Sequence, residues 1–309
     1  MKIGLLNLEP KYKNLAIEKL RLYHQQQGDE VEDYFALKAY DKVYCSSIFT
    51  FTKKGTVPQG GICGGTGFDL ITTLPPEIEE IKPHLNFGFT TRGCIRNCYF
   101  CFVPQKEGKV YVVGDVYDIW DGKGEEIILM DNNILALPSH FKEISKQIQK
   151  ENLRVDFNQG LDHRLITEEL WGILRSLKHV QEIRFAFDDI GYTKTVTKAL
   201  DLMKANGLKD WRTRWYVYIS EKDTFETVYR RLDILQKYKQ HAYLMRDIKV
   251  YDNPVWIALA QWTNFKGAFK LDAYRLFTEN KKFMPYAKYL PSQVIKEIKG
   301  ATDESPPSS

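Results

Sequence analysis

From Leu85 onward, short apolar runs alternate with segments in which apolar residues recur at helical spacing. The runs predict six strands, at Leu85–Thr90, Ile127–Met130, Arg154–Phe157, Glu182–Phe187, Arg214–Ile219 and Ala242–Met245. Successive runs lie about 30 residues apart, which is the length of a βαβ unit. Right-handed crossovers then give a parallel sheet with the helices outside it. Six such units predict a partial (β/α)6 TIM-like barrel over residues 85–250. A doubly wound open sheet is the alternative that spacing alone leaves open.

Residues 1–84 read as a separate small α/β (Rossmann-like) unit. Apolar runs predict strands at Ile3–Leu6 and Val43–Phe51, and between them Asn14 caps a helix that ends near Gly28. The glycine-dense segment Gly60–Gly67 lacks the G-x-x-x-x-G-K-[ST] string of a phosphate-binding loop. Its glycines are therefore expected to serve turns or a lid.

The sequence pattern of residues 251–299 predicts a helical extension in which aromatic and basic side chains are interleaved. These side chains are Trp256, Trp262, Phe265, Lys266, Lys270 and Arg275. Such a mixture can stack nucleobases, but at helical spacing we prefer the interpretation that it covers the open edge of the barrel. The tail 300–309 is polar, contains two prolines and is predicted to be disordered.

Composition narrows the class of protein. Hydrophobic residues make up 43% of the 309 residues and charged residues 27%, which predicts a globular core. The 44 basic and 40 acidic residues leave a net charge of +4, too even to indicate a nucleic-acid partner, although a nucleic-acid substrate stays open. The first apolar run is too short for a signal peptide, and no run approaches the roughly 18 residues of a membrane span. We expect a cytoplasmic protein with no membrane association.

Three of the five cysteines, Cys94, Cys98 and Cys101, form a C-x3-C-x2-C motif directly after a predicted strand. Thiolates are the usual ligands of a [4Fe–4S] cluster, and three of them leave one iron open for a cofactor or substrate. A structural zinc site needs a fourth ligand, and neither His84 nor His140 lies at zinc-finger spacing. A ferredoxin-type carrier would show C-x2-C-x2-C and a fourth cysteine. A non-catalytic iron–sulfur or zinc protein is the alternative function.

The motif, with Phe100 just before its last cysteine, resembles the signature of the radical S-adenosylmethionine (radical SAM) superfamily. The resemblance implies that the open iron binds S-adenosylmethionine and that one electron cleaves it to methionine and a 5′-deoxyadenosyl radical. It also implies that Phe100 lies against the adenine and that flavodoxin or ferredoxin donates the electron. The substrate and the reaction subclass are not implied; a transferase or methylthiotransferase-like reaction is compatible with this motif.

Polar residues at the predicted strand ends extend the resemblance. Asp131, Asn132 and Asn133 occupy the place where the superfamily binds the methionine amino group, often with Gly-Gly-Glu; a capped turn before Ser139 is the alternative. The run from Asn158 to Leu165 resembles a cobalamin-related subgroup. Within it Asn158 and Gln159 are expected to face the pocket, and Arg164 either does so or pairs with Asp162 or a helix carboxylate.

The last three strands end in further candidates for cofactor binding. By the resemblance, Asp188 and Asp189 bond the ribose hydroxyls, and the alternative is that they cap the helix near Tyr192. Ser220 and Arg246 are further pocket candidates, Arg246 as a partner for a carboxylate. His163, beside Asp and Arg, is expected to be a hydrogen-bonded structural residue rather than a catalytic base.

Residues 1–84 resemble a shortened cobalamin-binding-like domain, a likeness carried by the segment from Tyr40 to Tyr44 and by Gly60–Gly67. The cobalt-ligating Asp-x-His-x-x-Gly motif does not occur in the sequence, so bound cobalamin is not expected. Cys45 and Cys63 are too few, and wrongly spaced, for the second cluster of methylthiotransferases. We expect them to be ordinary buried or free thiols.

Overall fold

The computed structural model describes residues 1–270, 277 and 279–289. These belong to two compact units, residues 1–136 and 137–309. Both contain parallel strands joined by helices, which confirms the predicted α/β class. The boundaries at 84/85 and 250/251 stay predictions from the sequence, and the tail 300–309 and Arg275 lie outside the described residues. Among the helices that the structure describes, none is long and apolar enough to cross a lipid bilayer.

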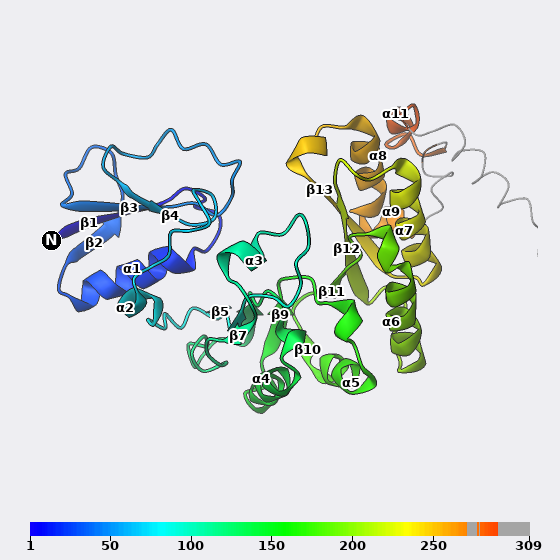
Figure 1. Cartoon of the computed structure of the whole chain (residues 1–309), viewed down its shortest axis with the longest axis horizontal. Coiled ribbons are helices and arrows are strands. Elements are labelled where there is room, and N and C mark those ends of the chain that lie inside the picture. The colour runs from blue at the N-terminus through cyan, green and yellow to red at the C-terminus, as the bar shows by residue number, and fades with distance from the viewer. Residues whose placement is uncertain (271–276, 278, 290–309) are drawn as a thin grey trace, which may run out of the picture. The chain divides into compact units, whose positions relative to one another are not determined.

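The first unit opens with a four-stranded parallel sheet and two helices (Figure 1). The strand order is β2-β1-β3-β4. The bounds are β1 Lys2–Asn7, β2 Glu30–Asp33, β3 Lys42–Ser46, β4 Ile62–Gly64, α1 Leu15–Gln26 and α2 Pro76–Glu79. As predicted, the side chain of Asn14 caps α1 by accepting the N–H of Ile17. The core between sheet and helices holds Ile3, Leu5, Ile17, Leu20 and Ile78.

The strand predicted at Val43–Phe51 ends early, at Ser46. Beyond it, the backbone N–H groups of Ile48 and Phe49 donate to the carboxylate of Glu9, at 3.0 and 3.2 Å, instead of to a neighbouring strand. The glycine-dense segment Gly60–Gly67, predicted to serve turns or a lid, contains strand β4 in its middle and makes turns on either side of it. Gly65 has φ +92°, and a Cβ at this position would lie 2.4 Å from the carbonyl oxygen of Ser47.

The first strand predicted after residue 84 is also shorter than expected. His84 and Asn86 have φ values of +48° and +58°, which break an extended chain before it reaches Phe87. Only β5 (Phe87–Gly88) remains, and it pairs in parallel with β8 (Glu126–Leu129). The 3-10 helix η1 (Ile134–Ala136) follows at the end of this unit.

The second unit alternates strands and helices as the sequence predicts. Its strands are β9 (Arg154–Phe157) paired with β10 (Lys178–His179), and the parallel set β11 (Ile183–Ala186), β12 (Thr213–Ile219) and β13 (His241–Arg246). Its α-helices are α4 Pro138–Lys150, α5 Glu168–Ser176, α6 Thr193–Ala205, α7 Phe225–Lys237, α8 Pro254–Thr263, α9 Lys266–Phe269 and α11 Met284–Ala287. The 3-10 helices are η2 His163–Leu165, η3 Ile190–Tyr192 and η4 Ile248–Val250.

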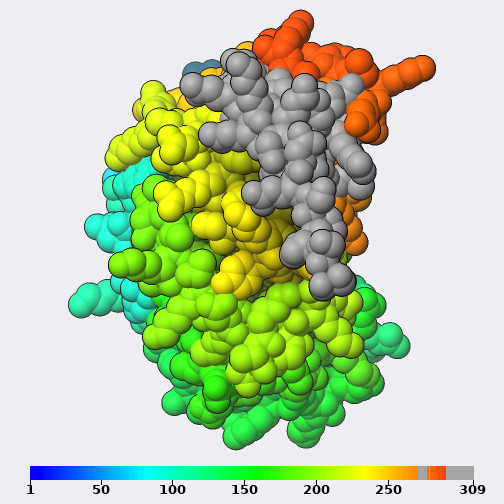
Figure 2. Space-filling view, turned by 90° about the vertical axis from the view of Figure 1, so that its right-hand side faces the viewer, coloured from blue at the N-terminus to red at the C-terminus, as the bar shows by residue number. Residues whose placement is uncertain are grey.

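Apolar faces of these elements form the core of the second unit. The inward residues of β12, Trp215, Val217 and Ile219, are fully buried, and so are Val228 and Leu232 of α7. In Figure 2 the yellow-green and yellow surface is the outer side of this helical layer. The 30-residue rhythm therefore reflects parallel strands with covering helices.

The C-terminal aromatic residues pack largely into the core. Trp256 and Trp262 of α8 are buried. Just after α8, the side-chain amide of Asn264 accepts the N–H of Leu244 at 2.7 Å and donates to its carbonyl oxygen at 3.2 Å. Leu244 lies in β13, the last strand of its sheet. The segment thus contacts the edge strand β13, while the closing of a barrel edge stays a prediction.

Candidate metal centre

The cysteine motif lies on a long loop that is closed at its base. Strands β6 (Thr91–Arg92) and β7 (Tyr111–Val112) pair in antiparallel fashion on either side of it. Gly93, with φ +82°, leaves the strand next to the backbone of Lys109. A Cβ at Gly93 would lie 2.3 Å from the Lys109 carbonyl oxygen, so the loop base requires glycine here.

Ion pairs of Arg92 reinforce the loop base. Its guanidinium binds both oxygens of Glu107 at 2.8 Å and donates to Glu79 of α2 at 2.7 Å. Burial disfavours the charge of Arg92, but the two carboxylates outweigh it and raise the pKa of the guanidinium. The residue therefore ties the start of the cysteine loop both to α2 and to Glu107, just after α3 (Val103–Lys106).

All three loop cysteines are half-buried, and none of the five cysteines forms a disulfide. The sulfur of Cys94 accepts the N–H of Arg96 at 3.3 Å and the side-chain amide N–H of Asn133 at 3.4 Å. The N–H of Cys101 donates to the carbonyl oxygen of Cys98 at 3.0 Å, which makes a turn between the second and third cysteines. N–H···S bonds of the kind made to Cys94 stabilise thiolates and tune iron–sulfur centres.

The sulfurs are on one loop but do not converge on one point. Throughout the residues that the structure describes, no three Cys, His, Asp or Glu side chains come close enough together to hold a metal ion. Phe100, between the second and third cysteines, is half-buried and packs edge-to-face on Tyr99 with ring centres 5.2 Å apart. The loop thus supplies three thiols and an aromatic ring, without a preformed metal cage.

Asp131, which follows β8 after Met130, is buried against the start of the cysteine loop. Its Oδ1 accepts the hydroxyls of Thr90 and Thr91, each at 2.7 Å, and both of their backbone N–H groups. Burial raises the pKa of Asp131, although these four hydrogen bonds oppose the shift. Its Oδ2 is buried and has no hydrogen-bond partner among the described residues.

Asn132 and Asn133 contact the same loop. The N–H of Gly93 donates to Asn132 Oδ1 at 2.9 Å, and Asn133 Nδ2 donates to Cys94. The remaining polar atom of the Asn133 side chain, Oδ1, is buried and, within the described chain, has no partner. The Asp-Asn-Asn segment therefore lies against the motif and presents two unsatisfied acceptors, Asp131 Oδ2 and Asn133 Oδ1.

The predicted ribose-binding pair, Asp188 and Asp189, divides into one half-buried and one exposed residue in the second unit. Asp188 accepts the N–H of Tyr218 at 3.2 Å, and burial raises its pKa to about 6. Asp189 accepts the N–H of Gly191 at 2.7 Å and caps η3, the alternative that the sequence left open for it. Burial therefore disfavours the charged form of the Asp188 carboxyl group.

Ser220 and Arg246 also follow neighbouring strands of this sheet. Ser220 is buried, and its N–H and hydroxyl donate to Asp223 at 2.9 and 3.1 Å. Arg246 donates to the carbonyl oxygen of Tyr251 at 2.6 Å and lies over the Tyr251 ring. Because β12 and β13 are parallel, both residues lie at the carboxyl end of the sheet.

The segment after β9 is built largely from internal contacts. Arg164 pairs with Asp162 at 2.6 Å, one of its two expected uses, and also lies over the Tyr192 ring. His163 is buried, with its ring nitrogens 2.9 Å from the carbonyl oxygen of Ala186 and 3.0 Å from the hydroxyl of Thr195, as expected of a structural histidine. Gln159 is exposed.

Arg231 of α7 is a site-supporting residue that the sequence analysis missed. It is fully buried, donates to the carbonyl oxygens of Phe187 and Tyr218 at 3.2 and 2.9 Å, and pairs with Asp223. One guanidinium thus fixes the ends of β11 and β12, next to Asp188 and Ser220. Its spacing from Val228 and Leu235 put it on the buried face of α7, a signal available in the sequence.

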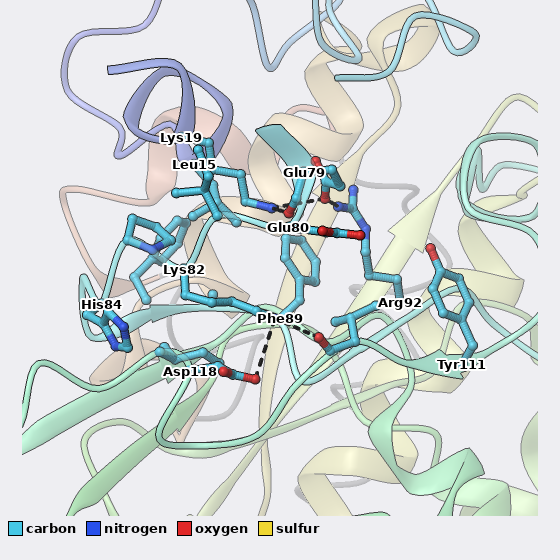
Figure 3. Close-up of a pocket in the computed structure, with 16 residues that line it drawn as sticks. Leu15, Lys19, Glu79, Glu80, Lys82, His84, Phe89, Arg92, Tyr111 and Asp118 are labelled. Atoms are coloured by element: carbon cyan, nitrogen blue, oxygen red, sulfur yellow. Dashed lines mark hydrogen bonds and ion pairs between the residues drawn. The ribbon is translucent and has the colours of Figure 1, made fainter. Parts of the chain in front are cut away.

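A cleft in the first unit adjoins the base of the cysteine loop. It encloses about 590 Å³, and its lining includes Leu20, Leu74, Ile78, Phe89, Arg92 and Tyr111. A neighbouring cavity of about 310 Å³ shares Lys19, Glu79 and Arg92 with it. Figure 3 shows Glu79 between the side chains of Lys19 and Arg92, with Phe89 below them. Burial lowers the pKa of Lys19, and the carboxylate of Glu79 opposes this shift.

No known protein family and no curated protein sequence matches the chain.

Proposed function

We propose that this protein is a radical SAM enzyme, in which Cys94, Cys98 and Cys101 bind a [4Fe–4S] cluster. The observation that carries the proposal is the contact between the cysteine loop and Asp131–Asn133. The residues in contact are 39 to 41 positions apart in the sequence. Beside a half-buried thiol, two buried acceptors have no donor among the described residues. An ammonium group supplies the donors that such acceptors need. The α-amino group of S-adenosylmethionine would provide it.

The residues present fit the cluster in kind and number. Three thiols within eight residues, one of which already receives two N–H groups, match the thiolate preference of iron–sulfur centres. The sulfurs do not converge as placed, and metal binding would draw them together because ligand loops commonly order with their metal. Gly93, the ion pairs of Arg92 and the β6–β7 pairing would hold the two ends of the loop together while the sulfurs move toward the metal.

When bound, the cluster would supply the electron that cleaves the sulfonium of S-adenosylmethionine to methionine and a 5′-deoxyadenosyl radical. The chain's own residues would orient the cofactor. Asp131 Oδ2 and Asn133 Oδ1 would accept the amino group, and Phe100 would pack against the adenine. The partial (β/α)6 TIM-like barrel predicted over residues 85–250 is part of this proposal, and so are Asp188, Ser220 and Arg246 of the second unit as residues for cofactor binding.

Anaerobic reconstitution with iron and sulfide tests the proposal. The wild-type chain should turn brown and, with dithionite, release 5′-deoxyadenosine from S-adenosylmethionine. Cys98→Ala should bind no cluster and release none, while its circular dichroism stays native. Cys63→Ala, which removes a thiol outside the loop, is the matched control and should behave as wild type. A brown protein that releases no 5′-deoxyadenosine, or one that binds only zinc, would contradict the proposal and support a binding protein.

A further inference from the structure

The two cysteines outside the loop, Cys45 and Cys63, are direct neighbours in the N-terminal sheet. Cys45 of β3 pairs in register with Cys63 of β4, and the two strands are parallel. Side chains at one register position of neighbouring strands point to the same face of the sheet. The Cys63 thiol donates to the carbonyl oxygen of Gly61 at 3.5 Å, and Gly61 also lies next to the Cys45 sulfur.

The shared face is the one opposite α1. Tyr44, the preceding residue of β3, packs on the core under α1, so the alternation of the strand points Cys45 to the other side. There it lies next to Gly61, where an added Cβ would be only 3.1 Å from the Cys45 sulfur. The glycine therefore leaves room for the thiol, which is 2% exposed.

The separation of the two strands suits a disulfide. Paired strands lie about 4.8 Å apart, which falls within the roughly 4.4–6.8 Å between Cα atoms that disulfides span. β4 is only three residues long and is the last strand of its sheet, so it can adjust to the bond. By this criterion the two thiols are positioned to become one cross-link between β3 and β4.

Exposure sets the order in which the thiols react. Cys63 is half-buried and therefore reachable from solvent. Cys45 is buried, and burial together with the neighbouring Cys63 raises its pKa to about 12. Because the thiolate is the nucleophile in thiol–disulfide exchange, Cys63 is the attacking residue. Once Cys63 has formed a mixed disulfide, its sulfur lies beside Cys45, which can attack it.

We propose that Cys45 and Cys63 form a reversible redox pair that is oxidised by low-molecular-weight disulfides. The Cys63 thiol loses its proton, attacks one sulfur of the small disulfide and releases the first small thiol. The Cys45 thiol loses its proton, attacks the sulfur of Cys63 and releases the second. Two protein thiols are oxidised by two electrons to a disulfide, and the small disulfide is reduced by the same two electrons to two thiols.

Mapping of thiols in the full-length protein tests the pair. The apoprotein is equilibrated with oxidised glutathione, quenched in acid, alkylated and digested with trypsin. Cys45 then lies in residues 43–53, Cys63 in 55–92 and Cys94 in 93–96, while Cys98 and Cys101 share 97–106. We expect 43–53 and 55–92 to appear as one disulfide-linked species that reduced dithiothreitol separates. The loop cysteines report in their own peptides, so the result is independent of the cluster.

Two variants assign the order of attack. Cys45→Ala should accumulate the mixed disulfide of glutathione on Cys63, because the resolving thiol is gone. Cys63→Ala should leave Cys45 as a thiol that reacts with the alkylating agent only after denaturation. If wild-type Cys45 stays a thiol while Cys63 retains glutathione, or if neither reacts while the loop cysteines are oxidised, the proposed pair is wrong.

Discussion

The side-chain amide of Asn133 donates a hydrogen bond to the sulfur of Cys94 at 3.4 Å, and so joins the end of β8 to the cysteine loop. This bond places an N–H donor on the first ligand of the proposed cluster. In metal sites such supporting residues orient the ligand and favour its charged form. The contact also explains why the other atom of the Asn133 amide, Oδ1, faces a place where the described chain offers no donor.

Asn133→Ala should weaken cluster binding by about 10- to 100-fold, the range typical of lost supporting bonds. The measurement is iron bound per chain as iron is titrated anaerobically. Asn97→Ala is the matched control, since Asn97 lies exposed in the same loop, and its iron binding should equal that of the wild type. Equal iron affinity of the two variants would show that the Asn133–Cys94 bond has no part in holding a cluster.

Arg92→Met should lower the free energy of unfolding by roughly 2 kcal/mol. The substitution leaves Glu107, which is 12% exposed, without its bidentate partner; a fully buried pair would cost about 3–5 kcal/mol, and partial solvation reduces the loss. Urea unfolding measures it. Lys38→Met, which breaks the exposed pair with Glu32, should cost under about 1 kcal/mol. A loss no larger than that of Lys38→Met would show that the ion pairs of Arg92 do not stabilise the base of the cysteine loop.

Apolar periodicity was enough to predict the longer helices and most of the parallel strands, but not the four-residue helices α2 and α3. Val228, Leu232 and Leu235 define one buried stripe on α7, and the structure buries all three. The short edge strands carried no such signal. β2 reads Glu-Val-Glu-Asp, and β7 is a pair of exposed residues, so neither has a buried face that would give it a recognisable pattern.

The candidate site was predictable in its cysteines but not in its supporting contacts. Thr90 and Thr91 resemble ordinary strand residues, and only the fold brings them to Asp131. The hydrogen bond from Asn133 to Cys94 joins positions whose proximity depends on the pairing of β5 with β8. Long-range contacts of this kind depend on strand order, which local patterns do not encode.

Asp188→Asn should stabilise the protein above pH 6 and lose this advantage below pH 4. The folded pKa of about 6 lies above the ordinary value of 3.8, so the folded state holds a proton that the unfolded chain has released. Wild-type stability therefore falls as pH rises from about 4 to 6, and the penalty persists above 6. The expected gain is on the order of 1–2 kcal/mol, less than the full linkage of about 3 kcal/mol because the side chain keeps some solvent contact. Asparagine keeps the acceptor for Tyr218.

Thermal unfolding at a series of pH values checks this prediction. Asp189→Asn is the matched control: it lies one residue away, is exposed and keeps its cap on η3. Because Asp189 is exposed, its replacement removes no buried charge, and the unfolding midpoint of its variant should stay close to that of the wild type. If Asp188→Asn and Asp189→Asn shift the midpoint alike at pH 8, burial of the Asp188 carboxyl does not control stability.

Gly93→Ala and Gly108→Ala separate two costs at the base of the cysteine loop. Both glycines have positive φ, +82° and +74°, so alanine strains the backbone at either position, by about 1 kcal/mol. Only at Gly93 does the new Cβ also meet a backbone atom, 2.3 Å from the carbonyl oxygen of Lys109, whereas the space around Gly108 is open. Gly93→Ala should therefore disrupt the pairing of β6 with β7 and abolish iron binding. Gly108→Ala should retain both the pairing and the iron binding. Hydrogen exchange at the backbone amides of Thr91 and Val112, with iron content measured in parallel, distinguishes the two variants. Similar exchange in both would mean that backbone strain alone, and not the close approach to Lys109, determines the structure of the loop base.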